Sequence, residues 1–275
     1  MTATADPFSV AGRIVAVTGG MGKLGRRMAQ TLLDRGARVV IVDSAADGRP
    51  IGEKLEAARR DGQLLLVRAD VTQRKSLEAA ADATERTFGG PADGLLTCAA
   101  LDSPPDAPAS QNGPLEDYPA DVWDQVMDVN VKGTFLSCQV FGARMRKAGR
   151  GSIINVSSIY GIVSPDQRIY AYRHARGEQF FKPVSYSTSK SALYNLTRYL
   201  ATYWGPYGVR ANTVTFGGVF DNQDPAFLEA YSARVPLGRM ARAGEYDATI
   251  VFLLSDASSY ITGADIAVDG GWTAW

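Results

Sequence analysis

Residues 13–25 read RIVAVTGGMGKLG, a short apolar run followed by a glycine-rich segment. Valine and isoleucine dominate the run, as in a buried strand, and a helical apolar pattern continues from Arg27 to Leu33. Glycines let the backbone approach a pyrophosphate closely, and the free amides of a helix start favour its negative charge. The stretch therefore predicts a strand, a phosphate-binding turn and a helix.

A second apolar strand, expected at 38–42, ends at Asp43. A carboxylate at this place can accept hydrogen bonds from the adenosine ribose of NAD, and it would repel the additional phosphate of NADP. Lys23 argues the other way, because a cation in the glycine turn could contact that phosphate. We weigh Asp43 more heavily, so this unit predicts a dinucleotide site that takes NAD in preference to NADP.

Strands and helices alternate along the rest of the chain. The further strands are expected at 64–69, 93–98, 151–156, 209–215 and 264–268, and the further helices at 51–60, 73–88, 122–131, 134–145 and 245–254. Repeated pairs of this kind predict an α/β fold with a doubly wound parallel sheet and helices on both faces. No repeat or change of composition interrupts the pattern, so residues 1–275 are predicted to form a single Rossmann-like domain.

The bulk composition favours small-molecule chemistry. Formal net charge is zero and no basic stretch is dense, which argues against nucleic acid and anionic membranes as partners. Residues 1–10 lack a basic region followed by an apolar run, and no later segment is apolar for long enough to span a bilayer, so we expect a cytoplasmic protein. Cys98 and Cys138 suit free thiols, while a single histidine, His174, speaks against a metal site or a Ser-His-Asp mechanism.

Tyr186 and Lys190 stand four residues apart in VSYSTSK, residues 184–190, at the start of another expected helix. Residues with this spacing share a helix face, so the ammonium group is expected to lie beside the phenol and to lower its pKa from about 10. The tyrosine could then exchange protons at neutral pH. The spacing alone is common in amphipathic helices, so the rest of the chain has to support this interpretation.

Other polar residues fall at strand ends or inside helices. Asp70 and Val71 follow a strand and could flank an adenine, although Asp70 could equally cap the next helix. Ser157 and Ser158 follow the strand at 151–156 and are expected to point into the ligand crevice. Asn130 lies within a helical run, where asparagine is unfavourable, which by itself assigns it no function.

Two segments are expected to cover the crevice. The first, about 163–183, is rich in basic and aromatic residues; it is either a solvated excursion or a lid whose Arg168 and Arg173 bind an anionic substrate group. The second, about 217–240, is a candidate substrate cover. The terminal tryptophans, Trp272 and Trp275, are expected to be buried in this cover or against a neighbouring subunit.

Jointly, these motifs resemble the short-chain dehydrogenase/reductase family over nearly the whole chain. The resemblance is carried by Thr18-Gly19 with Gly25, Asp70-Val71, Asn130-Val131-Lys132-Gly133, Ser157-Ser158, Tyr186-Ser187-Thr188-Ser189-Lys190 and Val268-Asp269-Gly270-Gly271. It implies a homo-oligomer, dimer or tetramer, that transfers hydride between NAD and a CH–OH group without a metal. The segments at 163–183 and 220–223 and the C-terminal tail look like oxidoreductases of bacterial surface-sugar pathways, including those of nonulosonate synthesis.

The resemblance also implies roles for individual residues. Tyr186 is the general acid/base, Lys190 holds the nicotinamide ribose and lowers the tyrosine's pKa, Ser158 binds the reacting oxygen, and Asn130 supports a proton-relay water. The implied cofactor-binding residues are Gly19, Gly22, Lys23, Leu24, Gly25, Asp43, Asp70, Val71, Ala99, Tyr186, Lys190, Gly217 and Val219. The substrate residues expected are Ser158, Arg168, Arg173, Phe220 and Asn222.

The chain departs from the family's pattern in four ways. Lys23 replaces the middle glycine of the turn, Thr97-Cys98-Ala99-Ala100 replaces Asn-Asn-Ala-Gly, and Phe216 replaces a proline. In addition, the segment at about 163–183 is an insert, which makes the separation between Ser158 and Tyr186 much longer than usual. The four residues with implied catalytic roles, Asn130, Ser158, Tyr186 and Lys190, are all present. We therefore predict an NAD(H)-dependent oxidoreductase that interconverts a secondary alcohol and a ketone on a sugar, sugar derivative or cyclitol. An epimerase or dehydratase with tightly held NAD and a non-catalytic nucleotide sensor are the alternatives.

Overall fold

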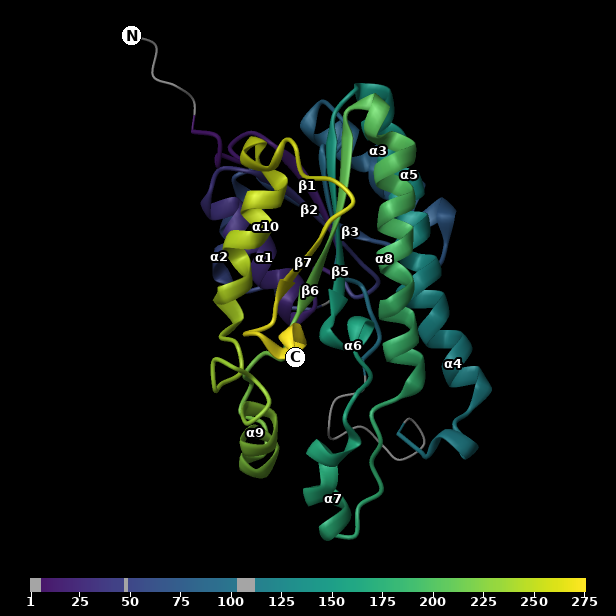
Figure 1. Ribbon diagram of the computed structural model, residues 1–275. Helices are drawn as coiled ribbons and strands as arrows, with labels where there is room; N and C mark the ends of the chain where they lie inside the picture. Colours follow the sequence, from purple (N-terminus) through teal and green to yellow (C-terminus); the bar gives the residue numbers. More distant parts are fainter. Residues whose placement is uncertain (1–5, 47–48, 103–111) are drawn as a thin grey trace.

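The computed structural model describes residues 6–46, 49–102 and 112–275. Within them, seven parallel strands form one sheet in the order β3-β2-β1-β4-β5-β6-β7 (Figure 1). The strands are β1 (Ile14–Thr18), β2 (Arg38–Asp43), β3 (Leu64–Arg68), β4 (Gly94–Thr97), β5 (Gly151–Ser158), β6 (Val209–Phe216) and β7 (Asp265–Val268). The order reverses between β1 and β4, so a crevice opens there at the carboxyl edge, where sheets of this kind bind ligands.

Helices cover both faces of the sheet (Figure 1). One layer contains α1 (Lys23–Asp34), α2 (Glu53–Arg60) and α10 (Asp247–Leu254), and the other contains α3 (Arg74–Phe88), α5 (Gly133–Ala148) and α8 (Val184–Trp204). A strand between two layers must be apolar on both sides, and β1 is accordingly buried at all five residues. The predicted doubly wound α/β fold is confirmed.

Two differences from the predicted elements affect the site, and the other boundaries differ by at most three residues, except that α1 begins four residues earlier than expected. The helices expected at 122–131 and 134–145 join into one: α4 (Ala120–Met127) runs through a π-helical turn (Asp128–Lys132) into α5. Such widened turns are often found at functional sites, and this one carries Asn130. Strand β5 continues two residues further than expected, so Ser157 and Ser158 end the strand instead of following it.

A third layer lies beyond the carboxyl edge of the sheet (Figure 1). It contains α6 (Ile159–Ile162), α7 (Ala171–Ala175) and α9 (Pro225–Ser232), with short 3₁₀ turns at Gln167–Tyr170 and Trp272–Ala274. Tyr170 and Phe180 of the insert are buried against Phe227 of the cover, and the Tyr170 ring lies 4.6 Å from that of Phe180 and 5.7 Å from that of Phe227. The insert is therefore not a solvated excursion, because it shares an apolar core with the cover.

The two terminal tryptophans have different surroundings. Trp272 is buried and stacks on Tyr231 of α9 with ring centroids 4.4 Å apart, which confirms the expected burial in the cover. Trp275 is 81% exposed. Only Trp272 therefore contributes to the core of this subunit.

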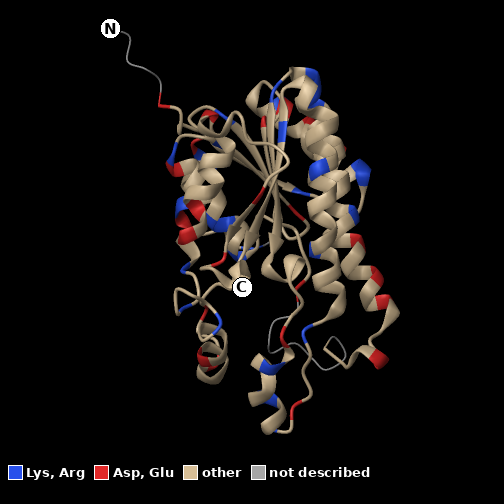
Figure 2. Cartoon of the chain, viewed as in Figure 1, with Lys and Arg blue, Asp and Glu red and all other residues tan. Residues whose placement is uncertain are grey.

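Charged residues of both signs are interspersed over the outer helices, whereas the strands are mostly uncharged (Figure 2). Among the residues that the structure describes, no helix combines the length and hydropathy required to cross a membrane.

Candidate active site

A cleft of about 860 Å³ opens at the carboxyl edge of the sheet. Its walls come from four regions: the glycine turn after β1, the end of β5, the start of α8, and the insert together with the cover. Ser158, Tyr186 and Lys190 line it, and so do Gly19 and Gly25. The structure thus brings the expected hydride-transfer and phosphate-binding residues into one cavity.

Tyr186 is half-buried on the first turn of α8, where its side chain hydrogen-bonds Ser158. Burial holds the pKa of the phenol far above its ordinary value, the negative charge of Asp102 raises it further, and the Ser158 hydrogen bond lowers it in part. The sequence predicted a lowered pKa, and this prediction is wrong because desolvation of the phenol outweighs the effect of the Ser158 hydrogen bond.

Lys190 lies one turn further along α8 and is buried, with its Nζ 5.8 Å from the centre of the Tyr186 ring. The ammonium group donates to the carbonyl oxygen of Val156 at 2.8 Å, which fixes its direction. Burial lowers the pKa of Lys190 to about 8. The lysine therefore exchanges protons near neutral pH more readily than an exposed one.

Both serines at the end of β5 line the cleft. The Ser157 hydroxyl donates to the backbone carbonyl of Lys190 at 3.0 Å and so holds α8 against the strand, which leaves Ser158 as the serine that is not tied to α8 by such a bond. The preference for Ser158 over Ser157 as the substrate-facing serine stays a prediction.

Asn130 is buried in the π-helical turn and uses its whole side chain to hold the site together. Its Oδ1 accepts from Leu101 N at 2.7 Å, and its Nδ2 donates to Leu101 O at 3.0 Å and to Ser189 Oγ at 2.9 Å. The asparagine thereby links the loop after β4 to α8. Its support of a proton-relay water stays a prediction.

The turn between β1 and α1 fits a pyrophosphate. Gly22 caps α1 without any side-chain hydrogen bond, and the first turn of the helix contains no acidic residue, so its amides face no competing carboxylate there. The turn is also packed too closely for side chains: a Cβ on Gly19 would lie 2.5 Å from the Ala99 backbone, and one on Gly25 would lie 2.4 Å from Gly19 O. Close backbone packing therefore requires glycine at both positions.

Asp43 ends β2 beside this turn. Its two oxygens accept from Met21 N at 2.9 Å and Ala45 N at 2.8 Å, so the carboxylate shapes the turn and retains lone pairs for a further donor. Lys23, the residue that argued for NADP, forms an ion pair with Asp221 of the cover. That pairing reduces the positive charge that an additional phosphate would meet.

The remaining expected cofactor residues fall into two groups. Leu24, Gly217 and Val219 line the cleft together with the glycine turn. Asp70, Val71 and Ala99 do not line it: Asp70 accepts from the backbone amide and hydroxyl of Thr72, Val71 is buried against Gly133, and the Ala99 backbone packs against Gly19. The alternative for Asp70, a cap of the next helix, is wrong as well, because the N-cap of α3 is Gln73 and no side chain caps the helix. Asp70 orders only the turn that precedes it.

The substrate residues expected from the sequence divide in the same way. Arg173 and Asn222 line the cleft, while Arg168 and Phe220 do not. Arg168 forms an ion pair with Asp166 at 2.7 Å and its side chain is 83% exposed, so it faces solvent. The choice of Arg168 for an anion clamp is therefore corrected by its position.

Sequence reasoning overlooked several residues of the cleft. Asp102 and Lys182 lie 80 positions apart and form an ion pair of 2.5 Å beside Tyr186. Tyr160 of α6 faces the same space. Lys182 stands four residues before Tyr186, a spacing that would put both on one helix face. Pro183 lies between them and precedes the first residue of α8, so the spacing did not predict a contact. Asp102 carried no signal, because a loop carboxylate has no periodicity to place it.

A buried polar network braces the sheet where the family's two asparagines are absent. Thr97 Oγ1 donates to Asn155 Oδ1 at 3.0 Å, Asn155 Nδ2 donates to Thr197 Oγ1 at 2.9 Å, and Thr213 Oγ1 donates to Thr197 Oγ1 at 2.8 Å. The network joins β4, β5, β6 and α8. Buried groups that satisfy one another in this way rigidify a core.

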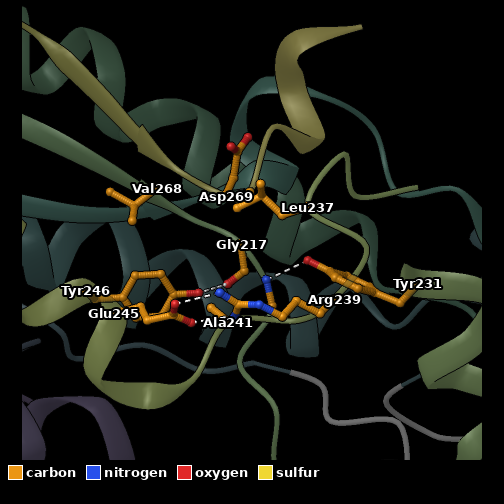
Figure 3. Close-up of a pocket in the computed structure, with 11 residues that line it drawn as sticks. Gly217, Tyr231, Leu237, Arg239, Ala241, Glu245, Tyr246, Val268 and Asp269 are labelled. Atoms are coloured by element: carbon orange, nitrogen blue, oxygen red, sulfur yellow. Dashed lines mark hydrogen bonds and ion pairs between the residues drawn. The ribbon is translucent and has the colours of Figure 1, made fainter. Parts of the chain in front are cut away.

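A smaller cavity of about 240 Å³ lies behind the cleft, next to Gly217 (Figure 3). Its polar groups already bind one another: Arg239 pairs with Glu245 at 2.6 Å, and the Tyr231 hydroxyl accepts from Gly218 N at 2.6 Å. The Tyr246 hydroxyl donates to Gly217 O at 2.8 Å. These contacts support the strand end that borders the cleft.

Known proteins share this arrangement along nearly the whole chain. Residues 20–273 match the family described as enoyl-(acyl carrier protein) reductase. The chain is 34% identical to D-threitol dehydrogenase of Mycolicibacterium smegmatis, over 97% of this chain and 95% of that protein. It is 35% identical to cis-4-hydroxycyclohexanecarboxylate dehydrogenase of Sinomonas cyclohexanicum, over 95% of this chain and 97% of that protein.

A crystal structure agrees with these matches. A short-chain dehydrogenase from Leptospira borgpetersenii with bound NAD⁺ superposes with a TM-score of 0.83 at 30% identity, covering 99% of this chain and 97% of that one. The narrower resemblance to surface-sugar oxidoreductases stays a prediction. The fold, the cleft and these matches together show that the chain belongs to the short-chain dehydrogenase/reductase family.

Proposed function

We propose that the protein is an NAD(H)-dependent oxidoreductase that interconverts a secondary alcohol and a ketone. The observation that carries the proposal is one cleft that is lined both by the glycine turn and by Ser158, Tyr186 and Lys190. When bound, NAD supplies the hydride chemistry. The protein supplies alignment and proton transfer: Ser158 holds the reacting oxygen, and the Tyr186 phenol gives or takes its proton.

The substrate that this cleft favours is uncharged and polyhydroxylated. The insert's cations that line the cleft are each paired: Arg173 with Glu178 at 2.6 Å, Arg176 with Asp224 at 2.6 Å, and Lys182 with Asp102. Ion pairs can exchange hydrogen bonds with several hydroxyl groups, whereas an anion would have to displace a carboxylate. We therefore revise the expected anion clamp in favour of a polyol, sugar or cyclitol, in line with the relative named for D-threitol.

A homo-oligomer fits the exposed aromatic side chains of α8. Tyr199 and Tyr203 stack with centroids 5.7 Å apart at 62% and 53% exposure, and Phe135 of α5 is 44% exposed. Faces of this kind are typical of subunit interfaces. The epimerase, dehydratase and sensor alternatives gain no support from relatives that are named as dehydrogenases, and the cytoplasmic location stays a prediction.

The proposed function is tested by incubating the purified protein with NAD⁺ and a panel of alcohols. We expect NADH to form with D-threitol, galactitol or myo-inositol and to form more slowly with 2-butanol, which offers the cleft a single hydroxyl group. No NADH with any member of the panel, and no NADH consumption with the matching ketoses, would contradict the proposal. A faster reaction with cis-4-hydroxycyclohexanecarboxylate than with the polyols would reverse the assignment to uncharged substrates.

Cofactor choice gives a separate prediction. Asp43→Asn removes the negative charge and keeps one of the two oxygens that accept from Met21 N and Ala45 N. We expect the preference for NAD⁺ over NADP⁺ in kcat/KM to fall about tenfold, because repulsion of the additional phosphate is lost. The matched control is Lys23→Met, which keeps Asp43 and removes the turn's cation. A preference that is unchanged in Asp43→Asn, or one that falls only in Lys23→Met, would show that Asp43 does not select the cofactor.

A further inference from the structure

The insert places a second ammonium group next to the catalytic tyrosine. Lys182 Nζ lies 4.6 Å from the centre of the Tyr186 ring, nearer than Lys190 Nζ at 5.8 Å. It also lies 5.8 Å from the Tyr160 ring, and the residue is 8% exposed. A cation over an aromatic face is attracted by the ring. In a desolvated place it also interacts strongly with the negative charge that the phenol carries after it loses its proton.

The position of Lys182 is determined by the insert. The Gln167 side chain forms two hydrogen bonds with the backbone of Lys182. Lys182 N donates to Gln167 Oε1 at 2.9 Å, and Gln167 Nε2 donates to Lys182 O at 3.1 Å. Phe180, two residues earlier, is buried in the core that the insert shares with the cover. The side chain is then held by its ion pair with Asp102. Backbone and ammonium group are thus both fixed.

We propose that Lys182 acts through Tyr186 as a second cation that stabilises its phenolate, and that the insert exists to hold it there. Asp102 is the counter-ion that keeps this buried charge in place and moderates its effect. The proposal rests on Tyr186 being the proton-transfer group of the proposed function. It assigns to the insert a role in the reaction step, in addition to covering the substrate.

Several charged or titratable groups act on Tyr186, and they come from different elements. They are Lys190 and Tyr194 of α8, Tyr160 of α6, Asp102 after β4, and Lys182 of the insert. Asp102 raises the pKa of Tyr186. A cation 4.6 Å from the ring has the opposite effect, so the two members of this ion pair act on the tyrosine with opposite signs.

That opposition defines the kinetic test. The measurement is the pH profile of kcat/KM for oxidation of D-threitol or the best alcohol of the panel. Lys182→Met should shift the rising limb to higher pH by about one unit, and Asp102→Asn should shift it to lower pH. Lys182→Arg should restore the wild-type limb. Arg168→Met is the control, because it removes a cation of the same insert outside the cleft, and its profile should match that of the wild type.

A second readout does not depend on turnover. Phenolate absorbance is titrated in the free enzyme and in the NAD⁺ complex, and the same titration of Tyr186→Phe is subtracted to isolate Tyr186. We expect the midpoint pH of the Tyr186 transition to rise in Lys182→Met and to fall in Asp102→Asn by similar amounts. These shifts would support the proposal even if no alcohol of the panel reacts, which separates it from failure of the proposed function.

Two results would contradict the role proposed for Lys182. If Lys182→Met lowers kcat but leaves both the pH profile and the phenolate transition in place, Lys182 has a structural role only and the proposal is wrong. Shifts of the same sign in Lys182→Met and Asp102→Asn would also overturn it, because loss of cleft geometry, and not charge, would then explain both.

Discussion

Tyr186→Phe is expected to lower kcat/KM roughly 10³-fold, within the range for loss of a positioned general acid/base. Phenylalanine keeps the ring that packs against the cations and loses only the hydroxyl that hydrogen-bonds Ser158. The apolar contacts of the ring are retained, so the fold and the cofactor turn should be undisturbed. Turnover should therefore collapse while NADH binding, measured by fluorescence titration, stays within about twofold.

The matched control for this variant is Tyr260→Phe. Tyr260 is fully exposed and is not among the residues that line the cleft. Its activity should equal that of the wild type. If Tyr186→Phe retained more than a tenth of the wild-type kcat/KM, another group would have to carry the proton and the assignment of Tyr186 would fail.

Lys190→Met is expected to remove activity and, at the same time, to stabilise the protein without cofactor. Burial lowers the pKa of Lys190 from 10.5 to about 8, which means that its charge costs the folded state free energy at neutral pH. Methionine avoids that cost but leaves Val156 O without its donor. We expect the free energy of unfolding to rise by roughly 1–2 kcal/mol. Each kcal/mol corresponds to about 2–4 °C in Tm for a protein of this size.

The pH dependence of this gain has a definite sign. Between about pH 8 and 10.5 folded Lys190 is deprotonated while the unfolded chain keeps the proton, so unfolding takes up a proton and wild-type stability rises with pH. The advantage of Lys190→Met should be greatest below pH 8 and shrink toward pH 10. Urea unfolding at both ends of this range measures it, with the exposed α3 residue Lys75→Met as control.

A variant that loses stability at every pH would show that the hydrogen bond to Val156 outweighs the buried charge. Activity should fall at least about 100-fold in either case, because Tyr186 loses the cation on its own helix. Activity equal to that of the wild type would remove Lys190 from the site.

Much of the fold could be predicted because its signals are local. A strand between two helix layers is buried on both faces, so β1 and β2 appear in the sequence as the apolar runs at residues 14–17 and 39–42. The helix boundaries near Asn130 could not be predicted, because a π-helical turn contains an additional residue and so shifts the apolar pattern of α5 relative to that of α4.

The candidate site shows the same limit. Spacing brought Tyr186 and Lys190 to one helix face, yet the direction of the tyrosine's pKa shift depends on burial and on Asp102, which only the folded chain brings near. Composition marked the insert as rich in cations, but it could not distinguish Arg168, which faces solvent, from Lys182, which faces Tyr186.

The sequence by itself therefore determined the architecture, the family resemblance and the order of the motifs, since these depend on periodicity and on residues close together in the chain. The tertiary structure decided which charges meet. Lys182 and Asp102 pair across 80 positions, and Arg176 of the insert pairs with Asp224 of the cover. Such contacts depend on how loops pack over the sheet edge, and no repeating pattern in the chain encodes that packing.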